Sequence, residues 1–520
     1  MRSIILLILI VLSSVLFGQA LTEYDFEYLI SEMKGEKMTL TEKTISLFTE
    51  INKIPRGSGN EKGLSDWLVE LSKKLGWEVI QDEVLNVIIR VPGKKSHTNK
   101  EAVVLQGHLD MVCVKEDGST HDFLTDPIVM YEEDGWLKAR GTTLGADNGV
   151  AIAISLALAL DDSIAHPPLE LLFTVDEERG LVGANNLQSD VLTGKYLINV
   201  DSEDEGIFTI GCAGGINTYI EMPLIYEENK QKLETFEISI SKLSGGHSGV
   251  QIHQQKPNAI QFMARTLNNI LEFAGDFHLI DFEAGIAHNV IPTSAVVRFS
   301  ADDFEQRHIE DMFIIFENEY RTFEPDMELS FKKIDVAEMF IKKDISENII
   351  RLLMSLPHGV FSMSREMDDL VETSNNLAQI EMIRHEESAG EYATLLKITL
   401  SQRSSVSSKL VFLTQKIESI AKLAGANVSS GIGYPPWEPV WDSELLKKSI
   451  LSYQNVFDKE PIIEVIHAGL ECGVIGSKYP DMEMISIGPG IKDAHTTQER
   501  LNIADIDKII RFLLELFENI

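Results

Sequence analysis

Short, almost wholly apolar segments recur between residues 40 and 215 and restrict the fold more than any other feature of the sequence. The segments 102–106 (AVVLQ), 169–175 (LELLFTV) and 196–200 (YLINV) have the length and composition of buried strands. Between them, residues 148–160 (NGVAIAISLALAL) have the length and composition of a helix. This alternation predicts an α/β layer with a largely parallel sheet.

Beyond residue 215 the continuous apolar segments give way to strands in which apolar and polar residues alternate. Examples are residues 235–241 (TFEISIS) and 394–400 (TLLKITL). Amphipathic helices are predicted between such strands, at 257–273 and 406–424. This region is therefore predicted to form an α+β unit.

The C-terminal part returns to the first pattern, with a predicted helix at 443–457, a short strand at 482–487 and a closing helix at 503–520. We therefore predict an α/β domain that is interrupted by an inserted α+β domain. The predicted bounds are 21–215 for the first part of the α/β domain, 216–438 for the inserted domain and 439–520 for the second part of the α/β domain.

The N-terminus carries a separate apolar segment, residues 4–17 (IILLILIVLSSVLF), which follows Arg2 and precedes Gly18-Gln19-Ala20. Small residues at these positions are typical of a signal-peptidase site. The segment is shorter than the roughly 20 residues of a membrane span. We predict a signal peptide over residues 1–20 and a chain exported to the periplasm or the extracellular space. An uncleaved membrane anchor is the alternative.

Charge and cysteine content narrow the possible partners. The chain has 81 Asp and Glu residues against 46 Lys and Arg, a formal net charge of −35. Nucleic acids and anionic membranes attract basic patches, so this balance argues against both as partners of the mature chain. Cys113, Cys212 and Cys472 are too scattered for a disulfide framework or a thiolate zinc site. Any metal ion should then be bound by histidines and carboxylates.

Histidines and acidic residues follow the predicted strands. Open α/β sheets place their active sites at the carboxyl ends of their strands, so these side chains should meet at one edge. Each element alone is weak, because a His-x-Asp pair or an acidic run is common on surfaces. Together they could bind two metal ions about 3.5–4 Å apart, with one bridging carboxylate. The set is His108, Asp110, Asp147, Asp176–Glu178, Asp201 and His495.

Longer motifs surround these residues and continue along the chain: GHLDMV, GTTLGADNGV, FTVDEERG, NVDSEDEG, GCAGG, LSGGHSG, HAGLECG and the late AH-T. In this order, from about residue 40 to the C-terminus, they resemble the co-catalytic zinc exopeptidases, which include glutamate carboxypeptidases and carnosinases. Within that family they are most similar to the aminoacyl-histidine dipeptidases. The resemblance implies a zinc-exopeptidase-like α/β domain with an inserted lid domain, through which a homodimer could form.

The resemblance also implies a centre of two zinc ions, for which cobalt or manganese would be alternatives. Asp147 would bridge both ions. His108 and Asp201 would complete the protein ligands of one ion, and Glu178 and His495 those of the other.

Two further carboxylates receive roles from the same resemblance. Glu177 would be the general base, taking a proton from the attacking water and returning it to the leaving amine. Asp110 would accept a hydrogen bond from His108 and fix its tautomer. The Asp147–Asn148 peptide bond is expected to be cis.

The inserted region offers candidate substrate-binding residues, namely His247 in GGHSG, Asn289 in AHNVIP and Arg403 in SQRSS. In similar enzymes a lid histidine stabilises the tetrahedral oxyanion, and an Arg or Asn holds the terminal carboxylate of the substrate. His467 in HAGLECG is predicted to lie on a substrate-facing loop, the alternative being a glycine-rich turn. His288 has no partner pattern and is treated as structural or exposed.

The predicted function is that of an exported metal-dependent dipeptidase that hydrolyses L-aminoacyl dipeptides, including Xaa-His. The alternatives with the same metal site are a tripeptide aminopeptidase, a carboxypeptidase and an N-acyl amino acid deacylase. An alternative of another class is a non-catalytic exported binding protein. The complete set of histidines and carboxylates argues against that last alternative, because a degenerate site would be expected to lose at least one of them.

Overall fold

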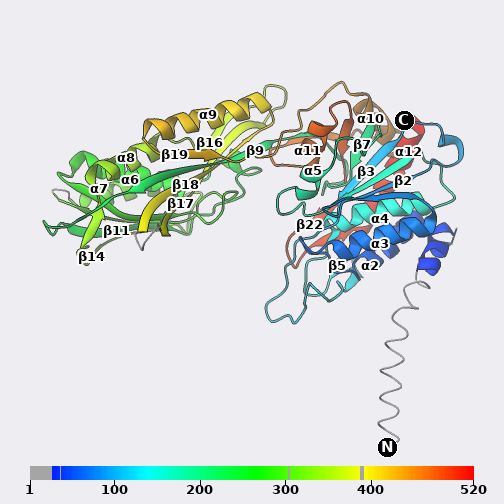
Figure 1. Ribbon diagram of the computed structural model, residues 1–520, viewed down its shortest axis with the longest axis horizontal. Coiled ribbons are helices and arrows are strands. Elements are labelled where there is room, and N and C mark those ends of the chain that lie inside the picture. Colours follow the sequence, from blue (N-terminus) through cyan, green and yellow to red (C-terminus); the bar gives the residue numbers. More distant parts are fainter. Residues whose placement is uncertain (1–25, 36, 303–304, 387–391) are drawn as a thin grey trace, which may run out of the picture. The chain divides into compact units, whose positions relative to one another are not determined.

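The computed structural model describes residues 26–520 except 36, 303–304 and 387–391 (Figure 1). The predicted signal peptide, residues 1–20, lies outside the described residues. The chain forms two compact units. The first contains the described residues up to Gly211 together with Pro439–Val465 and Leu470–Ile520. The second contains Cys212–Glu438 and Ile466–Gly469.

An eight-stranded sheet forms the centre of the first unit. The pairs β6–β3, β3–β7 and β7–β21 are parallel, whereas β1–β2, β2–β6 and β21–β8 are antiparallel. The sheet is therefore mixed, and its four parallel strands direct their carboxyl ends to one edge. The strand order is β1 (Glu78–Gln81), β2 (Val87–Val91), β6 (Leu169–Thr174), β3 (Val103–His108), β7 (Tyr196–Asn199), β21 (Glu483–Ser486), β8 (Ile207–Cys212) and β20 (Ile462–Ile466).

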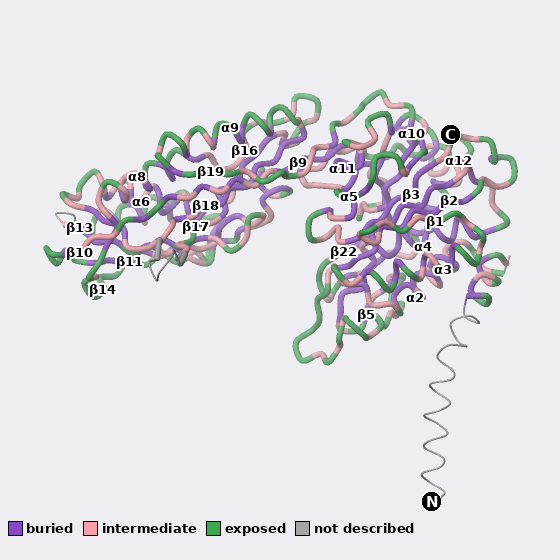
Figure 2. The backbone as a smooth tube through the Cα atoms, in the orientation of Figure 1, coloured by how far each residue is buried: buried purple, intermediate pink, exposed green. Residues whose placement is uncertain are grey.

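Helix α4 (Ala146–Leu160) is enclosed by this unit, and all of its residues from Asn148 onward are buried. A helix that is apolar on every side needs neighbours around it. Helix α4 packs against β3, α2 (Leu40–Ile51) and α12 (Ile503–Asn519), and Figure 2 shows the buried residues concentrated in this region. Further helices of the unit include α3 (Lys62–Leu75), α5 (Val182–Asn186), α10 (Glu444–Phe457) and α11 (Glu471–Lys478).

A small four-stranded sheet adjoins the same unit, in the order β22 (Ile491–Lys492), β23 (Arg500–Asn502), β5 (Trp136–Ala139) and β4 (Met130–Glu133). The antiparallel pair β22–β23 closes a hairpin, and its loop carries His495 and Glu499. This hairpin therefore brings the late histidine back to residues that are far earlier in the sequence.

The second unit is an α+β unit, as predicted, with a nine-stranded antiparallel sheet and the helices α6 (Ala259–Phe273), α7 (Arg307–Tyr320), α8 (Lys343–Ser355) and α9 (Ser407–Leu423). In β11 the burial alternates along the strand, as expected for a sheet with one covered face. The strand order is β14 (Glu328–Ile334), β11 (Glu234–Ser241), β13 (Ala295–Ala301), β12 (Phe277–Ala284), β17 (Val371–Glu386), β18 (Tyr392–Ser404), β9 (Gly214–Leu224) and β19 (Asn427–Ser430), with β16 (Gly359–Met363) paired to β17.

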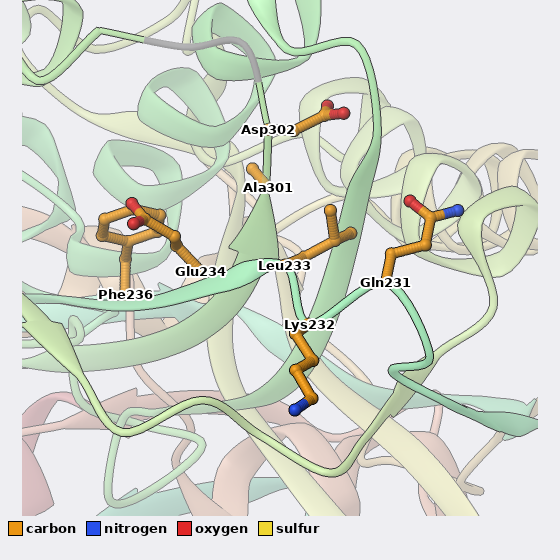
Figure 3. A pocket seen from close by; sticks show the side chains of 7 residues that line it. All are labelled: Gln231, Lys232, Leu233, Glu234, Phe236, Ala301 and Asp302. Atoms are coloured by element: carbon orange, nitrogen blue, oxygen red, sulfur yellow. The ribbon is translucent and has the colours of Figure 1, made fainter.

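A pocket of the second unit lies between the residues that precede β11 and the end of β13 (Figure 3). Its described lining contains neither histidine nor cysteine and consists of Gln231, Lys232, Leu233, Glu234, Phe236, Ala301 and Asp302. It therefore has no role in the metal chemistry that the sequence predicts. Among the described helices, none combines the length and the apolar character needed to cross a bilayer.

Candidate metal centre

The carboxyl ends of the parallel strands bring the predicted ligands together in the first unit. Strand β3 ends at His108, Glu177 and Glu178 follow β6, and Asp201 follows β7. His495 reaches the same place from the β22–β23 loop. This is the edge at which open α/β sheets place their sites, because the strand ends leave a crevice there.

Asp147, the predicted bridging ligand, stands in the first turn of α4, where the backbone departs from helical geometry. The Asp147–Asn148 peptide bond is cis, as the resemblance implies. The side chain of Asn148 ties this turn to two strands, since its Oδ1 accepts a hydrogen bond from His108 N–H (3.1 Å) and its Nδ2 donates one to the Val200 carbonyl (2.8 Å). The start of α4 is thereby fixed against the ends of β3 and β7.

Two triads of potential ligands share Asp147: His108–Asp147–Asp201 and Asp147–Glu178–His495. His108 Nε2 lies 3.0 Å from Asp147 Oδ1 and 3.5 Å from Asp201 Oδ1. His495 Nε2 lies 3.0 Å from Asp147 Oδ2 and 3.0 Å from Glu178 Oε1. Each oxygen of Asp147 therefore faces a different histidine, as a carboxylate that bridges two ions would require.

The pKa values of this cluster move in directions that indicate an excess of negative charge. Burial alone would lower the pKa of His108, but neighbouring carboxylates, led by Asp201, hold that pKa well above its usual value. Hydrogen bonds to Asp147 and Glu178 raise the pKa of His495 to about 11. Burial raises the pKa of Asp201 to about 6. Such a cluster would be relieved by bound cations.

The donor set fits two divalent ions. Imidazole nitrogens and carboxylate oxygens are suitable ligands for zinc, and they also suit cobalt and manganese. Each triad offers one imidazole and two carboxylates, which leaves room for a water or a substrate in a catalytic site. A third grouping joins His108 with Glu177 and Glu178, so Glu177 lies within reach of the same centre.

Asp110 is fully buried and contacts residues at the ends of both β3 and β6. Its Oδ1 lies 3.2 Å from His108 Nδ1 and accepts a hydrogen bond from Glu177 N–H (3.0 Å). Its Oδ2 accepts hydrogen bonds from Ser58 Oγ (2.8 Å) and Glu178 N–H (3.3 Å). Burial opposes ionisation, but His108 and these donors lower the pKa of Asp110 to about 2. Asp110 therefore holds the backbone of both glutamates and lies beside the imidazole of His108.

Replacing Asp110 with asparagine is expected to weaken zinc binding by about 10–100-fold, the range typical for a residue that orients a ligand. The amide nitrogen cannot accept the hydrogen bonds that the carboxylate accepts at present. Zinc affinity measured by competition with a chromophoric chelator checks this prediction. Asp117→Asn, at an exposed position, is the control. An unchanged affinity in Asp110→Asn would show that Asp110 does not orient the ligands.

Two supporting residues were missed from the sequence. Glu499 accepts hydrogen bonds from the backbone N–H groups of residues 144–147, at 2.7–3.3 Å, and so holds the turn that carries Asp147. Arg56 is buried and donates from Nη1 to the carbonyls of residues 109 and 110 at 3.1 and 3.0 Å. The spacing of Glu499, four residues after His495, was the available signal; no pattern around Arg56 pointed to it.

The predicted substrate-binding residues lie in the second unit. Burial and the charge of Arg403 lower the pKa of His247 to about 4 and that of His467 to about 3. His288 is exposed, in agreement with the predicted choice between a structural and an exposed residue. Partial burial and the charge of Arg403 lower its pKa as well. Arg403 therefore stands among imidazoles that are neutral at physiological pH.

Asn289 joins this cluster less directly, through its backbone. Its carbonyl accepts a hydrogen bond from Ser248 N–H at 2.8 Å. His467 is anchored through Nε2, which lies 2.7 Å from Ser374 Oγ. The structure thus groups His247, His467 and Arg403, whereas Asn289 contributes a backbone contact to the loop that carries His247.

Comparison with known proteins gives full-length relatives. The chain is 37% identical over 480 residues to the cytosol non-specific dipeptidase of Escherichia coli (strain K12), covering 91% of this chain and 96% of that protein. The crystal structure of aminoacylhistidine dipeptidase from Vibrio alginolyticus superposes with a TM-score of 0.82 at 33% identity, covering 93% of this chain and 98% of the other. Aminopeptidase PepT from Bacillus cereus, at 17% identity and a TM-score of 0.55, shares the fold.

The expectation of export is contradicted by this comparison. The Escherichia coli relative, which matches nearly the whole chain, is a cytosol dipeptidase by name. The prediction rested on the apolar segment at residues 4–17, which lies outside the described residues. A short apolar segment reports only local hydrophobicity, and such a segment alone does not establish a signal peptide.

The family is shown by the length of the match as well as by the motifs. The model of peptidase family M20/M25/M40 matches residues 104–519, a range that includes both triads and the second unit. The resemblance drawn from the motifs is confirmed, as is the prediction of an enzyme of the peptidase class. This chain belongs to the M20/M25/M40 family of peptidases.

Proposed function

We propose that the protein is a dipeptidase that hydrolyses L-aminoacyl dipeptides, including Xaa-His, with two zinc ions bound at the candidate metal centre. The observation that carries this proposal is the pair of triads that share Asp147, with each of its oxygens 3.0 Å from a different histidine. The dipeptidase names of the two full-length relatives support the substrate class.

Asp147 would bridge the ions, with His108 and Asp201 on one ion and Glu178 and His495 on the other. When bound, two zinc ions would supply Lewis acidity at the scissile carbonyl and at the attacking water. Cobalt or manganese would suit the same ligands. The protein would hold the ligands in place: Asp110 would orient the imidazole of His108, and Asn148 ties the first turn of α4 to the end of β3.

Glu177 remains outside both Asp147 triads and is suited to be the general base. Burial and the charges of Asp201, Glu471 and Glu178 raise the pKa of Glu177 well above its usual value, although His108 opposes this. A carboxylate with a raised pKa can take a proton from the attacking water and return it to the leaving amine near neutral pH. The N–H···Oδ1 bond to Asp110 orients its backbone for this transfer.

His247 is suited to donate a hydrogen bond to the tetrahedral oxyanion. Its Nδ1 accepts hydrogen bonds from the N–H groups of Gly249 and Val250, both at 3.2 Å, which leaves the ring proton on Nε2. Its lowered pKa of about 4 keeps the ring neutral. Arg403 would bind the terminal carboxylate of the substrate, and His467 and Asn289 would line the same region.

The test is hydrolysis of an L-aminoacyl-L-histidine dipeptide by the zinc-loaded protein, with a chelated sample, a tripeptide and an N-acetyl amino acid as comparators. We expect chelator-sensitive release of histidine from the dipeptide alone, with activity restored by zinc. Cleavage of only the tripeptide or the N-acetyl amino acid would contradict the substrate class, and chelator-resistant cleavage would contradict the metal centre.

The predicted homodimer through residues 216–438 is tested by light scattering of the protein in solution. The mass of a monomer would rule the homodimer out.

A further inference from the structure

Arg403 is a cation without a counter-ion in the described part of the chain. It is the penultimate residue of β18, between Ser374 of β17 and Gly215 of β9, and only 7% of it is exposed. No ion pair joins its guanidinium to a described carboxylate, and its Nε is buried without a hydrogen-bond partner. By contrast, Arg298 of the same sheet pairs with two carboxylates. Burying an unpaired guanidinium is costly unless an anion joins it.

One side chain fixes this guanidinium. Arg403 Nη1 donates a hydrogen bond to Tyr434 Oη at 2.8 Å, whereas Nη2 has no hydrogen bond to a described residue. Tyr434 comes from the Gly- and Pro-rich segment that follows β19, and its backbone exchanges two hydrogen bonds with Gly215, at 3.0 and 2.9 Å. The backbone of Tyr434 is therefore held on β9, the strand next to Arg403, and this places the tyrosine hydroxyl beside the guanidinium.

The ring of Tyr434 packs against two glycines, Gly215 and Gly469. A Cβ on Gly215 would lie 2.7 Å from Tyr434 Cζ and Oη, and a Cβ on Gly469 would lie 2.6 Å from Tyr434 Cε2. Side chains at either position would collide with the ring, so both glycines allow it to pack closely against the backbone. Burial raises the pKa of Tyr434, which keeps its hydroxyl protonated and neutral. The ring position thus leaves the hydroxyl little freedom.

We infer that Tyr434 is a positioning residue that aims the guanidinium of Arg403 at the terminal carboxylate of the substrate. This inference rests on the proposed function of Arg403. An arginine side chain loses conformational freedom when it binds a carboxylate, and a partner that has already fixed it reduces that cost. The hydroxyl fixes Nη1 and leaves hydrogens on Nη2 for the incoming anion.

The chemistry of the partner supports this role. A carboxylate at the position of Tyr434 would also orient Arg403, but it would neutralise the charge and compete with the substrate. A neutral hydroxyl orients the guanidinium and leaves its charge uncompensated. Tyr434 should therefore increase discrimination between a peptide with a free terminal carboxylate and the same peptide with a terminal amide.

The test compares Tyr434→Phe with the parent enzyme on an L-aminoacyl-L-amino acid and on its C-terminal amide. The variant keeps the ring and loses only the hydroxyl. We expect KM for the free acid to rise about tenfold with kcat within about twofold, and KM for the amide to stay unchanged. Tyr226→Phe makes the same change elsewhere in the second unit and should alter neither value. Thermal unfolding and zinc content verify that each variant is folded and loaded.

An unchanged KM for the acid, or an equal rise for acid and amide, would overturn the positioning role. Arg403→Met, measured in parallel, separates this outcome from failure of the proposed function. If Arg403→Met abolishes the acid–amide discrimination and Tyr434→Phe preserves it, only the inference about Tyr434 is wrong. If Arg403→Met itself preserves the discrimination, Arg403 does not bind the terminal carboxylate and both assignments fail.

Discussion

Glu177→Gln is expected to lower kcat for an Xaa-His dipeptide by about a thousandfold while both metal ions stay bound. Glutamine has nearly the shape of glutamate but cannot accept the proton of the attacking water. The N–H···Asp110 hydrogen bond of residue 177 involves the backbone and should survive the substitution. Steady-state kinetics together with metal analysis by mass spectrometry measure the two quantities separately.

Glu83→Gln, at an exposed position, is the matched control and should retain full activity. A variant at Glu177 that kept its kcat would exclude this residue as the base, and one that lost zinc would assign it to the ligands instead. The role of Glu177 as a base adds a pH dependence whose sign follows from the pKa of its carboxyl group. Activity should fall as the pH drops through that pKa, because the protonated carboxyl group can no longer accept a proton.

Asp147→Asn should have the second large effect, because each triad loses its shared member. Asparagine cannot supply two anionic oxygens, and its single carbonyl oxygen could face only one of His108 and His495, each of which now lies 3.0 Å from an oxygen of Asp147. We expect binding of two zinc ions to be lost and kcat/KM to fall by about a thousandfold or more, since Lewis-acid catalysis contributes several kcal/mol.

Isothermal titration of the metal-free protein with zinc measures this loss without reference to activity. A second readout is thermal unfolding, since a ligand that binds only the folded state raises the midpoint. Zinc should raise the midpoint of the parent protein and leave that of Asp147→Asn almost unchanged. Asp162→Asn, near the other end of α4 and largely exposed, should behave like the parent. Two tightly bound ions in Asp147→Asn would exclude the bridging assignment.

Local sequence patterns predicted much of the fold. The segments 102–106, 169–175 and 196–200 correspond to β3, β6 and β7, and the predicted helix at 148–160 begins two residues earlier as α4. These elements were predictable because burial on all sides requires apolar residues at nearly every position, and that requirement is visible in the sequence itself. The apolar segment at 4–17 shows the limit of such patterns, since the predicted export was wrong.

Strand direction was less accessible from the sequence. The central strands are parallel as predicted, but β1, β2 and β8 make antiparallel pairs that render the sheet mixed. The apolar pattern of a buried strand does not indicate whether the strand pairs parallel or antiparallel, because side-chain burial does not depend on the direction of the chain. The connections between the strands, and not the strands themselves, decide how each one pairs.

By itself, the sequence predicted the candidate metal ligands, because His108, Asp201 and the two glutamates directly follow recognisable strands and Asp147 opens a recognisable helix. Only the tertiary structure decided how those residues are held. Glu499 reaches the turn at Asp147 across more than 350 positions of the chain, and Tyr434 meets Arg403 across 31. Hydrogen bonds between distant segments depend on the packing of whole elements, which no local pattern of apolar and polar residues records.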